Sequence, residues 1–277
     1  MRLSVSCRIA ESFHSKEKSS MSFEQLADLA VESGYAAICM RASQVGVHSP
    51  IDEVLTARKI ADDRGLTISM ATGDFDIVYN NEDGPNCLRH ITPYLDLAET
   101  LGADLLRVCV KEQDDITHAQ AAADEAVGRG LTLVHQCHTL SLFETLNGIA
   151  ECLEMIDRAN FGLIFEAANL EGCGQDYGPA AVRRVAPWIR NVYLQNQILN
   201  PDGAVALETW CRGPVSFDIP QIHETGGIDF ASVFNGLKEI GYDGTITVHQ
   251  SGPDDPSVSA GADATKTATY LRSLWES

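Results

Sequence analysis

The sequence has no long apolar run and few basic residues, and each shortage excludes a class of protein. No run approaches the roughly 20 apolar residues that a membrane-spanning helix needs. Lysine and arginine total 20 against 39 aspartates and glutamates, which gives a formal net charge of −19. Such a charge repels nucleic acid and anionic membrane surfaces. We therefore expect no nucleic-acid partner and no membrane partner.

Cysteine motifs and a secretory signal are also lacking. The eight cysteines are scattered, and none of them forms a C-x-x-C pair. Their even number permits disulfides, but their spread over a chain of this length is more typical of free thiols in a reducing compartment. The N-terminus enters strand-like sequence at once, without the apolar region and cleavage site of a signal peptide. The expected location is cytoplasmic.

The sequence does contain a regular alternation of short apolar runs and amphipathic stretches. The apolar runs predict eight strands, which end near Cys7, Arg41, Ala71, Val110, Gln136, Glu166, Gln195 and His249. Eight strand–helix units in 277 residues predict a (β/α)8 TIM barrel of the α/β class, with residues 1–277 as a single domain. The rival fold, a doubly wound sheet, would be favoured by a G-x-G-x-x-G motif after the first strand, and the sequence has none there.

Two connections in this barrel are predicted to be loops. The shorter one is polar and runs from Gly73 to Pro85. The longer one is an insertion of about residues 197–227 between the seventh and eighth strands. A loop of that length in a compact domain usually covers a site or makes a contact in an oligomer, so homo-oligomerisation stays open.

Polar side chains gather where the predicted strands end, which is where barrels of this kind carry their active sites. Glu166 is the only acidic residue that ends a clear apolar strand, and alternation along the strands turns it inward. Arg41, Arg107 and Arg8 lie in or just after three other strands. The predicted pocket contains Gln136, His138, Glu166, Asn169, Gln195, Asn196 and His249, with these arginines around it.

Each of these residues taken alone also has a structural explanation. A histidine at a strand end can simply be hydrogen-bonded to a neighbour, and amide side chains can satisfy loop backbone. The arginines can pair with Glu166, Asp74, Asp76 or Glu112 and hold loops in place. Their combination on one predicted rim favours a functional site.

The C-terminal part of the sequence resembles a known superfamily. Gly227-Ile228-Asp229-Phe230, then Leu237, then residues 241–248 (GYDGTITV) are similar to the closing motif of the xylose isomerase-like TIM barrels. Residues 130–138 resemble the fifth strand of that superfamily, and residues 165–169 resemble its sixth. The resemblance covers nearly the whole chain. It implies a sugar isomerase or epimerase, or an abasic-site DNA endonuclease, which the acidic net charge argues against.

The resemblance also implies one divalent metal, which the family binds through Glu, Asp, His and Glu on strands five to eight. The matching positions here carry Gln136, Glu166, Tyr193 and His249. Glu166, His249 and Gln136 with water would suit Mn²⁺, Fe²⁺ or Zn²⁺ better than Mg²⁺, which prefers several carboxylate oxygens. If no metal binds, Gln136, Asn196 and Arg107 would hold substrate oxygens directly.

The resulting functional hypothesis is an isomerase or epimerase of sugar metabolism. It would transfer a proton next to the carbonyl group of a small carbohydrate-like substrate, with His249 and Glu166 as the catalytic residues. A keto-sugar lyase or dehydratase, or a barrel that binds a sugar-like ligand without catalysis, remains the alternative. Arginines suit carboxylate or phosphate groups, which predicts an anionic substrate. The predicted substrate-binding residues are Arg41, Arg107, His138, Asn169, Gln195, Asn196, Trp210 and Arg212.

Overall fold

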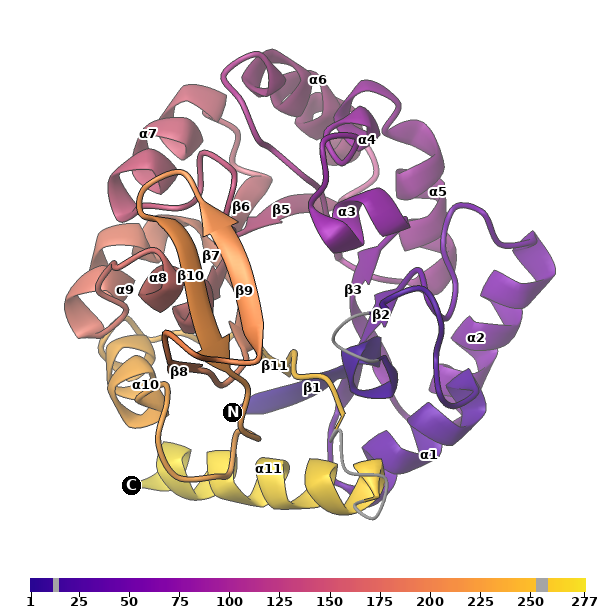
Figure 1. Ribbon diagram of the computed structural model, residues 1–277. Helices are drawn as coiled ribbons and strands as arrows, with labels where there is room; N and C mark the ends of the chain where they lie inside the picture. The colour runs from indigo at the N-terminus through magenta and orange to yellow at the C-terminus, as the bar shows by residue number, and fades with distance from the viewer. Residues whose placement is uncertain (12–14, 253–258) are drawn as a thin grey trace.

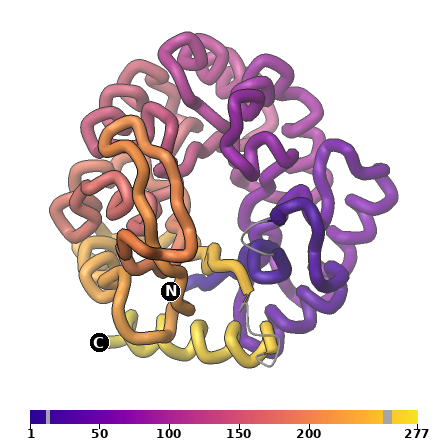
Figure 2. Tube along the Cα trace, in the orientation of Figure 1, coloured from indigo at the N-terminus to yellow at the C-terminus, as the bar shows by residue number. Residues whose placement is uncertain are grey.

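A computed structural model of the protein describes residues 1–11, 15–252 and 259–277. Its centre is a closed barrel of parallel strands in the order β1-β11-β7-β6-β5-β4-β3-β2 (Figure 1). The chain runs once around the barrel, so that its first and last strands lie side by side and pair (Figure 2). The barrel strands are β1 (Arg2–Ser6), β2 (Ala37–Arg41), β3 (Thr67–Thr72), β4 (Leu105–Arg107), β5 (Thr132–Gln136), β6 (Phe161–Glu166), β7 (Ile189–Leu194) and β11 (Thr245–Val248). The predicted (β/α)8 fold is confirmed.

Helices surround this barrel, and their sequences show why they form. In α1 (Phe23–Glu32) the buried residues repeat at helical spacing, and Ser22 with Gln25 forms a capping box at the N-terminus. α5 (Thr92–Leu101) ends at Gly102, whose φ of 66° is the left-handed conformation that glycine adopts without steric cost. The other outer helices are α2 (Ile51–Asp63), α6 (Asp115–Val127), α7 (Leu146–Ile156), α9 (Pro179–Val185), α10 (Phe230–Glu239) and α11 (Ala260–Glu276). No helix in the described ranges is long and apolar enough to cross a membrane.

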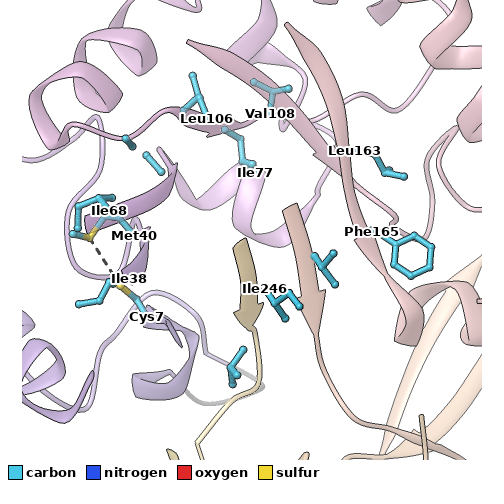
Figure 3. Close-up of a cluster of buried hydrophobic side chains, with 14 of the residues drawn as sticks. Cys7, Ile38, Met40, Ile68, Ile77, Leu106, Val108, Leu163, Phe165 and Ile246 are labelled. Carbon is cyan, nitrogen blue, oxygen red and sulfur yellow. Dashed lines mark hydrogen bonds between the residues drawn. The ribbon is translucent and has the colours of Figure 1, made fainter. Parts of the chain in front are cut away.

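The hydrophobic core has two parts because alternate strand residues face opposite sides of the barrel wall. The larger cluster lies between strands and helices, and Figure 3 shows Leu163 and Phe165 of β6 and Ile246 of β11 within it. The smaller cluster fills the barrel interior and includes Ile164 of β6. Its members are Cys39, Met70, Val134, Ile164 and Tyr193. Glu166 follows Ile164 on the same side of β6, so its side chain lies above this apolar layer.

The connections contain more regular structure than the sequence pattern indicates. The segment 73–85, predicted as a loop, includes α3 (Phe75–Tyr79), whose N-terminus is capped by the Asp74 side chain. The insertion between β7 and β11 includes an antiparallel sheet of β8 (Ile198–Leu199), β9 (Val205–Thr209) and β10 (Gly213–Asp218), in the order β8-β10-β9. We call the β9–β10 hairpin, residues 205–218, the covering hairpin. Further short helices are η1 (Cys7–Ala10), α4 (Asn86–Arg89), α8 (Ala167–Gly172) and η2 (Ala186–Trp188).

Candidate active site

A cavity of about 190 Å³ lies at the C-terminal ends of the barrel strands. Side chains at the ends of β2, β4, β5 and β6 line it, and the covering hairpin contributes Leu207 and Glu208. Glu166 and His249 both line this cavity, as the alternation of the strands predicts. The predicted site residues that line it are Arg41, Arg107, Gln136, His138, Glu166, Asn169, Gln195 and His249, together with Arg8.

The Glu166 carboxylate is held by two side-chain amides. Its Oε2 accepts hydrogen bonds from Gln136 Nε2 and from Asn169 Nδ2, the latter at 2.6 Å. Oε1 has no hydrogen-bond partner within the described part of the chain. The protein therefore fixes one carboxylate oxygen and leaves the other available to a ligand.

The environment of Glu166 adjusts its acidity. Burial raises the pKa of this carboxyl to about 7, because the charged form loses its water. The hydrogen bonds from Gln136 and Asn169 and the positive charge of Arg107 lower the pKa, but they do not cancel the effect of burial. A carboxyl with a pKa near neutrality can both accept and donate a proton at working pH.

His249 follows β11 and is fixed by contacts on three sides. Its ring stacks on Tyr193, with 3.9 Å between the ring centroids and 7° between the planes. Nδ1 lies 3.1 Å from Ser6 Oγ, and Nε2 lies 3.4 Å from Nη1 of Arg41. A guanidinium group only donates, so Nε2 is the acceptor and the ring proton belongs on Nδ1. Burial and the charge of Arg41 lower the pKa of His249 well below its ordinary value, which makes it a weak base.

His138 has the same tautomer as His249, but no arginine among the described residues occupies its lone pair. Its Nδ1 lies 3.1 Å from the carbonyl oxygen of Thr139, which can only accept, so Nδ1 carries the proton. Nε2 then holds a lone pair and has no hydrogen-bond partner within the described residues. Burial and the charge of Arg107 lower the pKa of His138 well below its ordinary value. His138 is therefore a neutral acceptor on the cavity wall.

Three arginines bring positive charge to the cavity, and one carboxylate forms ion pairs with two of them. Glu11 receives two parallel hydrogen bonds from Arg41, at 2.9 Å from Nε and 2.8 Å from Nη2. The same carboxylate forms an ion pair with Arg8 at 3.5 Å. Arg107 is 2% exposed, and its Nε has no hydrogen-bond partner among the described residues. A buried guanidinium group of this kind is costly unless an anion meets it.

Several residues of the site are not found by sequence reasoning. The sequence pattern predicts Glu166, Asp74, Asp76 and Glu112 as partners of the arginines, whereas the structure uses Glu11, just beyond η1. Lys16 also lines the cavity, and burial together with the nearby arginines lowers its pKa to about 7. The other unpredicted polar residues are Tyr79, Asn80 and Glu208. All of these residues lie outside the barrel strands, so alternation along those strands does not indicate which way their side chains point. For Glu208, its position in the long insertion is the one feature of the sequence that indicates a place near the site.

Three predicted substrate-binding residues are not among the described residues that line this cavity. Asn196 uses its side-chain amide to hold the insertion, donating to the Gln221 and Gly226 carbonyls. Arg212 donates to the carbonyls of Glu171 and Gly172 near the end of α8. Trp210 is 53% exposed at the tip of the covering hairpin.

The residues at the four family metal positions do not fit a divalent cation. Gln136 points its amide nitrogen, a donor, at Glu166, and His249 points its lone pair at Arg41. The Tyr193 hydroxyl lies 3.4 Å from Cys39 Sγ in the apolar layer. This leaves one carboxylate among buried guanidinium groups, whereas hard cations take several oxygen ligands. In the described ranges, three His, Cys, Asp or Glu ligand atoms come together at one other place, Glu144 with Cys173 and Cys211.

Solved structures with the same architecture span the whole chain. A probable 3-DHS dehydratase, AsbF, from Bacillus anthracis has a TM-score of 0.71 at 14% identity, covering 98% of this chain and 99% of its own. D-psicose 3-epimerase with D-tagatose from Clostridium cellulolyticum H10 has a TM-score of 0.73 at 11% identity, covering 99% of each chain. The IOLI protein with a bound zinc atom has a TM-score of 0.73 at 16% identity, covering 100% of this chain and 98% of its own. At these identities the likeness shows the fold.

The sequence comparisons agree with this architecture. No curated protein matches the sequence significantly. The family described as xylose isomerase-like TIM barrel matches residues 27–274, which is most of the chain. The protein therefore belongs to the xylose isomerase-like TIM barrel family.

Proposed function

We propose that the protein is an isomerase or epimerase that moves a proton next to the carbonyl group of a small, anionic, polyhydroxylated compound. The observation that carries this proposal is that Glu166 and Arg107 line the same cavity. Glu166 has an open oxygen and a pKa raised to about 7. Arg107 is buried with an unpaired Nε among the described residues. A proton-transfer group and an unmatched cation are what enediolate chemistry requires.

In this mechanism Glu166 is the base. Its ionised carboxylate takes a proton from the carbon beside the carbonyl group and, in an isomerisation, returns it to the neighbouring carbon on the same face. In an epimerisation, a second proton donor on the opposite side of the substrate protonates the carbon. Arg107 stabilises the negative charge that develops on the carbonyl oxygen. His138 accepts a hydrogen bond from a substrate hydroxyl through Nε2, and the buried Oε1 of Gln136, which also lacks a partner among the described residues, accepts a second.

This proposal changes the role assigned to His249. Because its lone pair faces Arg41 at 3.4 Å, we propose that His249 positions this guanidinium group and does not remove the proton. Because the residues at the family metal positions do not fit a divalent cation, we assign stabilisation of the negative charge on the substrate oxygen to the arginines. The chain's own residues then carry every step.

The charge around the cavity supports an anionic substrate. Arg8, Lys16, Arg41 and Arg107 line it, against Glu166 and Glu208. Glu11 compensates part of the positive charge of Arg8 and Arg41. The charge of Arg107 is available to an anionic ligand. Sugar acids and sugar phosphates present the carboxylate or phosphate groups that guanidinium binds in a bidentate manner.

The solved relatives are consistent with this class of chemistry. One is named a D-psicose 3-epimerase and another a probable 3-DHS dehydratase. The second candidate function is a barrel that binds such a ligand without turnover. The glutamine and histidine at positions 136 and 249, where the family typically has glutamates, favour it.

Ligand binding can be tested by thermal shift with matched pairs of sugars. We expect ketose phosphates and sugar acids to raise the melting temperature, and the parent neutral sugars to leave it unchanged. The Arg107→Met variant should lose this response, whereas Arg212→Met, which changes a guanidinium group outside the cavity, should retain it. Stabilisation by neutral sugars alone would contradict an anionic substrate.

Proton transfer can be tested separately, by incubating each stabilising ligand with the enzyme in D₂O. NMR should show deuterium entering at the carbon next to the carbonyl group with the wild type and not with Glu166→Gln. Binding without deuterium incorporation would instead establish the non-catalytic barrel.

A further inference from the structure

A second cluster of ligand-type side chains lies away from the Glu166 cavity. Glu144, Cys173 and Cys211 place one ligand atom each within 4.8 Å of the others. They come from three different segments: the loop before α7, the residue after α8, and the turn between β9 and β10. Groups so far apart in sequence meet only because the covering hairpin folds back onto the barrel.

The Glu144 carboxylate is fixed before any ligand arrives. Oε1 accepts hydrogen bonds from the backbone nitrogens of Leu140 at 2.6 Å and Trp210 at 2.8 Å. Oε2 accepts one from the backbone nitrogen of Cys211 at 2.8 Å. Each carboxylate oxygen has two acceptor sites, so Oε2 retains one. Backbone donors of this kind orient metal-binding carboxylates in proteins.

The two thiols complete a partly open site. Cys173 is buried, whereas Cys211 is exposed. Cys211 Sγ lies 3.4 Å from the Cys173 carbonyl oxygen.

We propose that Glu144, Cys173 and Cys211 bind a soft divalent cation of the Zn²⁺ class, with water as the fourth ligand on the exposed side. Thiolate sulfur selects such ions over Mg²⁺ and Ca²⁺. In a tetrahedral site with Zn–S bonds of about 2.3 Å, the two sulfurs lie roughly 3.8 Å apart. The two sulfur atoms, which lie within 4.8 Å of each other, thus need to approach by about 1 Å or less. Binding releases the two thiol protons.

This site would act on the covering hairpin. Cys211 lies at its turn, and Leu207 and Glu208 on β9 line the Glu166 cavity. A bound cation would fasten the turn to the end of α8 and so hold β9 over that cavity. The inference does not depend on the reaction proposed for Glu166.

The test uses reduced, chelator-treated full-length protein and Co²⁺ as a spectroscopic probe, followed by Zn²⁺ competition. We expect one equivalent of Co²⁺ to produce a sulfur-to-metal charge-transfer band with release of two protons, and Zn²⁺ to abolish the band by displacing Co²⁺ without further proton release. Cys211→Ser, at an exposed position, should fold normally and lose the band. Glu144→Gln should weaken binding by more than about tenfold. The control Cys152→Ala removes a buried thiol of α7 and should leave the band unchanged.

Hydrogen exchange of residues 205–218 provides a readout independent of absorbance. Zn²⁺ should slow exchange there in the wild type and have no effect in Cys211→Ser. The proposal is overturned if the wild type gives no charge-transfer band, or if the band persists in both Cys211→Ser and Cys173→Ser. It is also overturned if the reduced protein binds no Co²⁺ and the pair forms a disulfide on treatment with a mild thiol oxidant.

Discussion

At the scale of single residues, Glu166 shows a conflict between stability and chemistry. Its pKa is raised from 4.5 to about 7 by burial. Between these values the folded protein binds a proton that the unfolded chain does not bind. Stability therefore falls as the pH rises through this window, and the loss is complete above pH 7. A carboxyl suited to proton transfer is thus maintained at a cost in folding free energy.

We predict that Glu166→Gln stabilises the protein at pH 8 by up to about 3 kcal/mol while abolishing deuterium incorporation. The glutamine oxygen can still accept from Gln136 and Asn169, so no buried donor loses its partner. Urea unfolding at pH 4.5 and pH 8 measures the effect, which should be absent at the lower pH. Glu151→Gln, at an exposed position of α7, is the control and should show no such dependence. A Glu166→Gln variant less stable than the wild type at pH 8 would falsify this account.

At the scale of elements, β5 carries polar residues on both of its faces. Gln136 faces the cavity, whereas His135 faces the surrounding layer, where its ring meets Phe143 edge-on with 4.5 Å between centroids. Nδ1 of His135 lies 3.0 Å from the Val108 carbonyl oxygen and so donates to it. Burial lowers the pKa of His135 to about 3. Below about pH 6.5 the unfolded chain binds a proton that the folded protein does not bind, so stability is lost as the pH falls from 6.5 towards 3.

We predict that His135→Asn reduces the loss of unfolding free energy as the pH falls below 6.5. Asparagine Nδ2 can replace Nδ1 as the donor to Val108, but it does not titrate. The pH-dependent loss should shrink by about 5 kcal/mol over the full window, although the smaller side chain lowers stability uniformly. Unfolding free energies at several pH values between 3.5 and 7 measure the slope. His90→Asn, an exposed position, should leave that slope unaltered.

The strands also show how far sequence reasoning reaches. β2, β5 and β6 end at Arg41, Gln136 and Glu166 as predicted, because an apolar run buried on both faces stops visibly at a polar residue. β4 ends at Arg107 and not near Val110, since the apolar residues that follow are buried outside the sheet. Glu11 and Lys16 cannot be placed from the sequence, because a loop has no period from which direction can be read.

The same limit applies to the insertion. Its length indicates a functional cover, and β9 does contribute to the cavity lining. The Glu144 carboxylate accepts hydrogen bonds from the backbone of Trp210 and Cys211 and so fixes the position of the hairpin. That position decides which of its side chains face the cavity. Such contacts join segments 66 and 67 residues apart and leave no local pattern. The sequence pattern therefore assigns Trp210 and Arg212 to the cavity, whereas Leu207 and Glu208 line it.

At the scale of the whole molecule, acidic residues outnumber basic ones by 39 to 20. Many surface arginines are paired as a result of this excess, as when Arg129 pairs with both Asp96 and Glu99. Exposed pairs of this kind contribute only about 0–1 kcal/mol each. The uncompensated charge repels itself in the compact state.

We predict that NaCl raises the melting temperature at pH 7.5, because screening relieves this repulsion more than it weakens exposed ion pairs. The rise should be steepest below about 0.15 M, where the Debye length falls from about 30 Å to about 8 Å. Near pH 5, close to the sequence pI of 4.6, the response should be small. A melting temperature that falls with salt at pH 7.5 would show that the ion pairs dominate.

The pairing of β1 with β11 has a consequence for biosynthesis. Residues 2–5 reach their partners, residues 245–248, only after some 240 further residues have been translated. At about 5–20 residues per second this takes on the order of tens of seconds. Throughout that interval one edge of β1 stays unpaired, and the cavity lacks the wall that His249 supplies. The nascent chain is thus exposed to aggregation for most of its synthesis, and a chaperone that shields the first strand should increase its yield.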